Sequence, residues 1–76
     1  MNRKNNLTTK ETFALAIQNH QKKNFETAGN LYKEILKINP NHFGSIFYLG
    51  SLLVQTKNFV KAKSLLQKAK RLSVGI

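Results

Sequence analysis

The 76-residue sequence has no cysteine, no aspartate and no tryptophan, and it has a single proline. Without cysteine there is neither a disulfide framework nor a thiolate metal site to reinforce a small core. A chain of this length lies near the lower limit at which one apolar core stabilises itself. The missing cysteines fit a reducing compartment.

Long apolar runs are also missing. The most apolar stretch, residues 46–54, is interrupted by Gly50 and Ser51 and is too short to cross a bilayer. The first ten residues are polar and basic and lack the apolar segment of a secretory signal. We therefore expect a cytoplasmic protein with no membrane span.

Acidic residues are scarce: three glutamates, Glu11, Glu26 and Glu34, stand against 13 lysines and arginines, for a net charge of +10. Such a balance is compatible with an anionic partner such as nucleic acid, a lipid surface or an acidic peptide. The densest basic group is Lys61, Lys63, Lys68, Lys70 and Arg71. Because these residues fall at mixed helical phases, and patch geometry makes a nucleic-acid site, we favour solvated helix faces and do not expect nucleic acid binding.

An internal repeat organises the rest of the chain. The tripeptide Lys23-Asn24-Phe25 recurs as Lys57-Asn58-Phe59, 34 positions later. Aligning 9–42 with 43–76 pairs further residues of the same kind: Phe13 with Phe47, Leu15 with Leu49, Ala28 with Ala62, and Leu31 with Leu65. Such a period indicates one supersecondary unit used twice. We divide the chain into a flexible basic tail (1–8), a first repeat (9–42) and a second repeat (43–76).

Each repeat contains the pattern of two helices. Thr8 followed by Glu11 predicts a capping box, and apolar residues then recur at helical spacing until Lys22. The second helix begins near Phe25 and ends at Asn39, because the residue before a proline disfavours the helical region. We expect Asn41 to cap the third helix. The fourth is expected to run from about residue 60 to 71, and no segment has the pattern of a strand.

This pattern resembles the tetratricopeptide repeat (TPR) family, whose 34-residue unit is a helix–turn–helix. The residues that carry the resemblance are Leu15-Ala16 and Leu49-Gly50, Phe25 and Phe59, Ala28 and Ala62, Tyr32 and Leu66, and Pro40. The resemblance implies an all-α fold of two TPR hairpins, stacked as a short right-handed α-solenoid. It also implies that Phe25 and Phe59 pack at the hinge of each hairpin. The departures are Thr12 and Ile46 in place of tryptophan, the bulky Ile35, and Val74 in place of a second proline.

No set of residues predicts catalysis. The glutamates fit helix capping and ion pairing, and the glycines are too isolated to form a phosphate-binding loop. His20 lies near the end of the first helix, where we expect a surface side chain, and His42 lies in a cap region. Neither has the convergent ligands that a metal site needs. We expect no enzymatic activity, no metal and no cofactor.

The resemblance implies that the first helix of each repeat lines a concave groove. The candidate partner-binding residues are Lys10, Phe13, Ile17, His20, Gln21, Phe47, Ser51, Val54 and Gln55. A groove with two phenylalanines one repeat apart suits an apolar partner segment, unless Phe13 and Phe47 pack on each other or on a neighbouring repeat. The Lys/Asn carboxylate clamp of one TPR subclass and the asparagine ladder of another are both missing, the ladder because Ala14 and Tyr48 stand at its positions.

A second candidate interface is the edge beyond the last helix. Solenoid repeats bury their apolar faces against the next repeat, and about three repeats are usually needed. The residues expected to face a missing third repeat are Leu66, Ala69, Leu72 and Val74, with Ile76 beyond. An uncovered strip of this kind indicates an interface, either for self-association or for further TPR repeats.

The leading hypothesis is a non-catalytic scaffold, in which a protein or peptide partner binds the concave groove or the C-terminal edge. One alternative is the N-terminal TPR fragment of a larger glycosyltransferase- or sulfotransferase-type protein. The other is a basic helical module that binds RNA or an anionic surface, for which binding would weaken steeply with salt.

Overall fold

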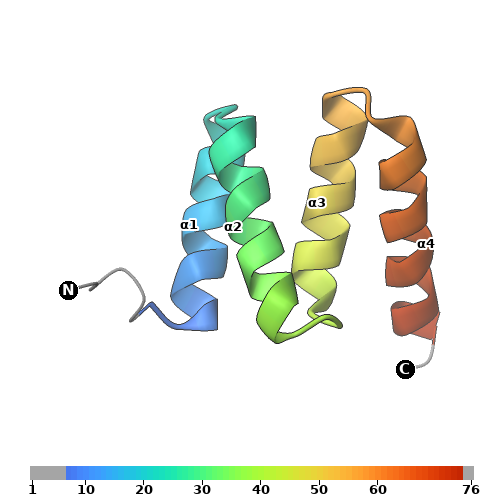
Figure 1. Cartoon of the computed structure of the whole chain (residues 1–76), viewed down its shortest axis with the longest axis horizontal. Coiled ribbons are helices and arrows are strands. Elements are labelled where there is room, and N and C mark those ends of the chain that lie inside the picture. Colours follow the sequence, from blue (N-terminus) through green and yellow to red (C-terminus); the bar gives the residue numbers. More distant parts are fainter. Residues whose placement is uncertain (1–6, 75–76) are drawn as a thin grey trace.

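The computed structural model describes residues 7–74 and consists of four helices. These are α1 (Thr9–Gln21), α2 (Phe25–Ile38), α3 (Phe43–Gln55) and α4 (Phe59–Val74). Figure 1 shows them side by side in sequence order, with each helix antiparallel to its neighbour. The described residues contain no strand, which confirms the prediction of stacked all-α hairpins. Most of the predicted tail (1–6) and the end of the predicted edge (75–76) lie outside the described residues.

The turn inside each hairpin explains the repeated Lys-Asn-Phe tripeptide. Lys23 and Lys57 adopt positive φ angles of 65° and 66°. In the first turn the backbone N–H of Asn24 donates to the carbonyl of Asn19 and that of Lys23 to the carbonyl of His20, at 2.8 and 3.0 Å. These are the two hydrogen bonds of a Schellman motif, here with lysine where glycine is usual. The second turn makes the equivalent bonds, so the tripeptide encodes the same backbone reversal twice.

The helix starts agree with the sequence in one place and differ in another. At α1 the predicted capping box is confirmed, since the Thr8 hydroxyl accepts from the Glu11 N–H and the Glu11 carboxylate accepts from the Thr8 N–H, both at 3.0 Å. At α3 the prediction of Asn41 is wrong: the cap is His42, whose Nδ1 accepts from the Ser45 N–H at 3.0 Å. The backbone N–H of Asn41 is instead bonded to the Asn39 side chain.

Small residues allow the helices of each hairpin to cross closely. Ala28 in the first hairpin and Ala62 in the second are both buried. At Gly50 a Cβ atom would lie only 2.7 Å from the Leu66 Cδ2 and 2.9 Å from its Cγ, so any larger residue there would displace the Leu66 side chain. The two hairpins pack through α2 and α3, where Gly29 faces Leu49. The buried cluster at this junction consists of Ala16, Ala28, Tyr32, Leu49 and Leu52.

The two hinge phenylalanines differ, which corrects the expectation that both pack there. The Phe25 ring is half-buried and lies edge-on to His20, with 5.9 Å between ring centroids. Phe59 is 60% exposed. His20, which packs against Phe25, has Val54 as its equivalent in the second repeat, so the aromatic contact at the hinge occurs in the first repeat alone among the described residues.

Candidate functional site

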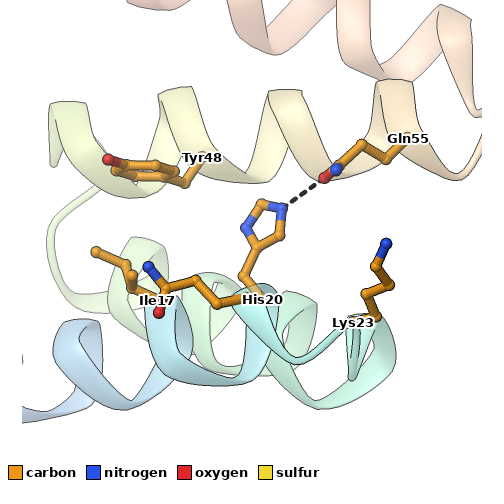
Figure 2. Close-up of a pocket in the computed structure, with 6 residues that line it drawn as sticks. Ile17, His20, Lys23, Tyr48 and Gln55 are labelled. Carbon is orange, nitrogen blue, oxygen red and sulfur yellow. Dashed lines mark hydrogen bonds between the residues drawn. The ribbon is translucent and has the colours of Figure 1, made fainter.

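A cleft lies between α1 and α3, the first helices of the two repeats. We call it the α1–α3 cleft; its volume is about 310 Å³. Its lining residues are Ile17, His20, Gln21, Lys23, Tyr48 and Gln55. Figure 2 shows the His20 ring reaching from α1 toward α3, where Tyr48 and Gln55 face it. Both repeats contribute side chains, so the cleft exists only because the hairpins stack.

His20 links three helices at the base of this cleft. Its Nε2 lies 2.6 Å from the Gln55 Oε1, and its Nδ1 lies 3.0 Å from the Tyr32 hydroxyl. Because the Gln55 oxygen can only accept, Nε2 donates to it, and in the neutral imidazole Nδ1 then accepts from the Tyr32 O–H. The expectation of a surface histidine is therefore corrected: His20 is half-buried and hydrogen-bonded on both sides.

Tyr32 completes this arrangement from the core. Its side chain is fully buried, and burial, together with a smaller contribution from Tyr48, raises the pKa of the Tyr32 hydroxyl to about 12. The phenol is therefore neutral at physiological pH and retains the proton that it donates to His20. The His20 ring is thus held by two hydrogen bonds, a part-buried one to Tyr32 and an exposed one to Gln55.

Phe13 does not stand open in the groove. Its ring packs near Tyr32, His42 and Tyr48, with centroid distances of 6.2, 5.0 and 5.8 Å. The Tyr48 ring also lies 5.6 Å from the Phe47 ring, so it stands between the two phenylalanines. Of the three expected arrangements, which were a shared groove, mutual contact and packing on a neighbouring repeat, Phe13 adopts the last. Phe13 serves the packing between the repeats.

The second repeat leaves apolar side chains uncovered on the other side of α3. Phe43, Phe47 and Val54 are 45%, 43% and 42% exposed. The Phe43 and Phe47 rings stack at 6.0 Å with an interplanar angle of 11°. A second cleft of about 310 Å³ lies beside them, between α3 and α4. Its lining residues are Phe43, Phe47, Leu66, Ala69, Lys70 and Ser73.

The structure divides the predicted groove residues into separate places. The α1–α3 cleft brings together Ile17, His20, Gln21 and Gln55. Phe47 lines the α3–α4 cleft, Val54 is exposed on α3, and Ser51 is half-buried. Lys10 is exposed on the first turn of α1 and lines neither of these two clefts. As a binding surface, the groove stays a prediction.

Two residues of the α1–α3 cleft were missed from the sequence, Lys23 and Tyr48. A signal for Tyr48 was available, because it occupies the position at which one TPR subclass has a groove-lining asparagine. For Lys23 there was none, since its place follows from the positive φ angle that ends α1.

The predicted C-terminal edge is more covered than expected. Ala69 is only 4% exposed, and Leu66 and Leu72 are half-buried, because these residues pack toward α3. Val74 is 72% exposed. Among the exposed side chains of α4 are the polar and basic residues Lys63, Gln67 and Arg71. Whether this edge binds a partner remains a prediction.

The chain was compared with protein-family models, with curated proteins and with solved structures. A family model described as Tetratricopeptide repeat matches residues 20–72. The comparisons with curated proteins and with solved structures each gave no significant match. Between Leu7 and Val74, none of the helices has the length and apolar character that crossing a membrane requires.

Proposed function

This chain belongs to the tetratricopeptide repeat family, whose members generally mediate protein interactions, and from that premise we propose that it binds a partner segment in the α1–α3 cleft. The observation that carries the proposal is that both repeats line this cleft, with Ile17 and His20 on one side and Tyr48 and Gln55 on the other. A segment lying in it contacts two helices at once. In this proposal the chain acts as a non-catalytic scaffold.

The chemistry of the cleft favours an extended peptide. Ile17 and Tyr48 offer apolar surface, and the Tyr48 ring, 37% exposed, is the kind of large, rigid side chain that dominates interface energies. Gln21 and Gln55 carry amides that both donate and accept, as the backbone of an extended segment requires. Lys23 contributes a positive charge, and no acidic residue lines the cleft, so the segment is expected to carry a carboxylate near Lys23.

A random peptide library displayed on phage tests this proposal. The immobilised chain is expected to enrich peptides that combine apolar residues with a carboxylate. Titration of a selected peptide is then compared between Tyr48→Ala and Phe43→Ala. Both rings lie on α3 and are similarly exposed, but only Tyr48 lines the α1–α3 cleft.

We expect Tyr48→Ala to weaken binding by about tenfold or more. Phe43→Ala should leave the affinity within about twofold, the usual scatter for an independent site. Equal losses in both variants, or a loss in Phe43→Ala alone, would place the peptide elsewhere and refute the proposed cleft. As a control, circular dichroism of both variants must show the same helix content as the unchanged chain.

A further inference from the structure

One set of equivalent positions is covered by neighbouring residues in the first repeat and more exposed in the second. A shift of 34 residues pairs Phe13, His20, Phe25 and Tyr32 with Phe47, Val54, Phe59 and Leu66. We call the second set, Phe47, Val54, Phe59 and Leu66, the apolar strip. The first four are buried or half-buried, whereas three members of the strip are exposed and Leu66 is half-buried. Equivalent positions therefore have a neighbour in one repeat and lack one in the other, within the described residues.

The first repeat shows which kind of element covers such a surface. The covering element there is a helix, α3. Its Gly44 lies against the Phe13 ring, its Tyr48 stacks with Tyr32 at 6.3 Å, and its Gln55 bonds to His20. Because the strip occupies the same positions on the same two-helix scaffold, a helix in the equivalent orientation fits it.

Charge distinguishes the helix that would cover the second repeat from α3. On α2, Gly29 faces α3 and Leu36 packs on the apolar core. The equivalent residues of α4 are Lys63 and Lys70. They are seven residues apart, on one side of the helix, and Lys70 lines the α3–α4 cleft. Residues 43–76 contain no acid that could neutralise these lysines.

We propose that the apolar strip docks an amphipathic helix from a partner protein, with acidic residues beside its apolar face to pair with Lys63 and Lys70. The apolar face would cover Phe47, Phe59 and the α3–α4 cleft, as α3 covers the first repeat. A second copy of this chain is a poor occupant, because each copy carries a net charge of +10. The proposal does not depend on peptide binding in the α1–α3 cleft.

The test uses a synthetic amphipathic peptide of roughly 15 residues, long enough to be helical, with a leucine face bordered by glutamates. A matched peptide carries glutamine in place of every glutamate. Both are titrated calorimetrically into the full chain at about 0.15 M salt, where a Debye length of about 8 Å suppresses the effect of distant charge. We expect the glutamate peptide to bind about tenfold more tightly than the glutamine peptide.

Variants of the chain then locate the peptide. The pair Lys63→Glu and Lys70→Glu is expected to weaken binding by about tenfold or more. The control pair, Lys22→Glu and Lys37→Glu, makes the same change in net charge at exposed positions of the first repeat and should have an effect of at most about threefold. Phe59→Ser, at an exposed position, should also weaken binding. As a control, each variant must keep the helix content of the unchanged chain in circular dichroism.

Several outcomes would overturn the proposal. Equal affinity for the two peptides, or equal losses in the two lysine pairs, would show that Lys63 and Lys70 do not recognise acidic residues. Loss of binding in Ile17→Gln with no effect in the lysine variants would place the peptide in the α1–α3 cleft. Concentration-dependent association of the free chain in sedimentation would make a second copy the occupant. Single-stranded RNA that binds more tightly than the peptide, through the same lysines, would make the surface a nucleic-acid site.

Discussion

The two repeats share a backbone and differ in their surfaces. The turns at Lys23 and Lys57 have nearly identical φ angles, and Ala28 and Ala62 are buried at the same crossing. Charge diverges: residues 9–42 hold five basic residues and three glutamates, a net charge of +2, whereas residues 43–76 hold six basic residues and no acid, a net charge of +6. The repeat period therefore encodes how the chain folds back at each turn, whereas the element packed against each repeat determines which of its side chains are buried.

The largest effect is expected where a buried residue of the first repeat is replaced by its second-repeat counterpart. Tyr32→Leu removes the hydroxyl that donates to His20 and much of the ring that stacks with Tyr48. We expect the free energy of unfolding to fall by about 2–4 kcal/mol, the range of large-to-small core substitutions. Chemical denaturation followed by circular dichroism measures it.

Tyr32→Phe distinguishes the contribution of the hydroxyl from that of the ring, because it removes only the hydrogen bond to His20. It should lower the free energy of unfolding by about 1 kcal/mol. If Tyr32→Leu costs no more than Leu66→Ala, the covered cluster of the first repeat contributes no more stability than its open counterpart. The comparison between the repeats would then lose its energetic meaning.

An intermediate effect is expected at two helical glycines. Gly50→Ala places a Cβ 2.7 Å from the Leu66 Cδ2 and displaces the Leu66 side chain from its packing, so the free energy of unfolding should fall by about 1–2 kcal/mol despite the better helix propensity of alanine. Gly29→Ala is the matched control, since its Cβ would lie 3.9 Å from Leu49, an ordinary contact. That variant should gain up to about 1 kcal/mol. Thermal melts of both variants give the two signs, and a stabilised Gly50→Ala would contradict the close α3–α4 crossing.

The smallest effects are expected at the turns. Lys23→Gly and Lys57→Gly each relieve a side chain in the left-handed region, and each should raise the free energy of unfolding by up to about 1 kcal/mol. The two gains should be equal within error in parallel denaturant titrations, because the turns are superimposable in their hydrogen bonds. A gain at one turn and a loss at the other would show that the repeats do not share this geometry.

Much of the fold could be predicted from the sequence because it depends on local signals. Thr8 with Glu11 indicated the start of α1, the Asn39-Pro40 pair indicated the end of α2, and the 34-residue period indicated the two hairpins. The cap at His42 was missed because Asn is the more usual capping residue, although an imidazole nitrogen can also accept a hydrogen bond from a helix N–H. Asn41 lies one residue before the cap, and its backbone N–H donates to the Asn39 side chain.

The candidate site was harder to predict because burial in a stacked repeat depends on the adjacent repeat. Phe13 and Phe47 occupy equivalent positions of the two repeats. Phe13 is half-buried because α3 of the second repeat packs against it, whereas Phe47 is exposed. His20 was expected at the surface, since its partner Gln55 is 35 positions away and no periodicity relates the two. Ala69 was expected at an open edge, whereas it packs on the helix of its own hairpin.

The bond between His20 and Gln55 has a consequence for folding kinetics. The extensive helix contacts join elements that follow one another in the chain, a topology that favours folding in microseconds to milliseconds. The His20–Gln55 bond instead closes a loop of 35 residues, between helices that touch along only a short stretch. If this contact forms after the transition state, its loss should accelerate unfolding and leave the folding rate nearly unchanged. This pair of side chains would then contribute to the lifetime of the stacked state more than to its rate of formation, in addition to the apolar packing between α2 and α3.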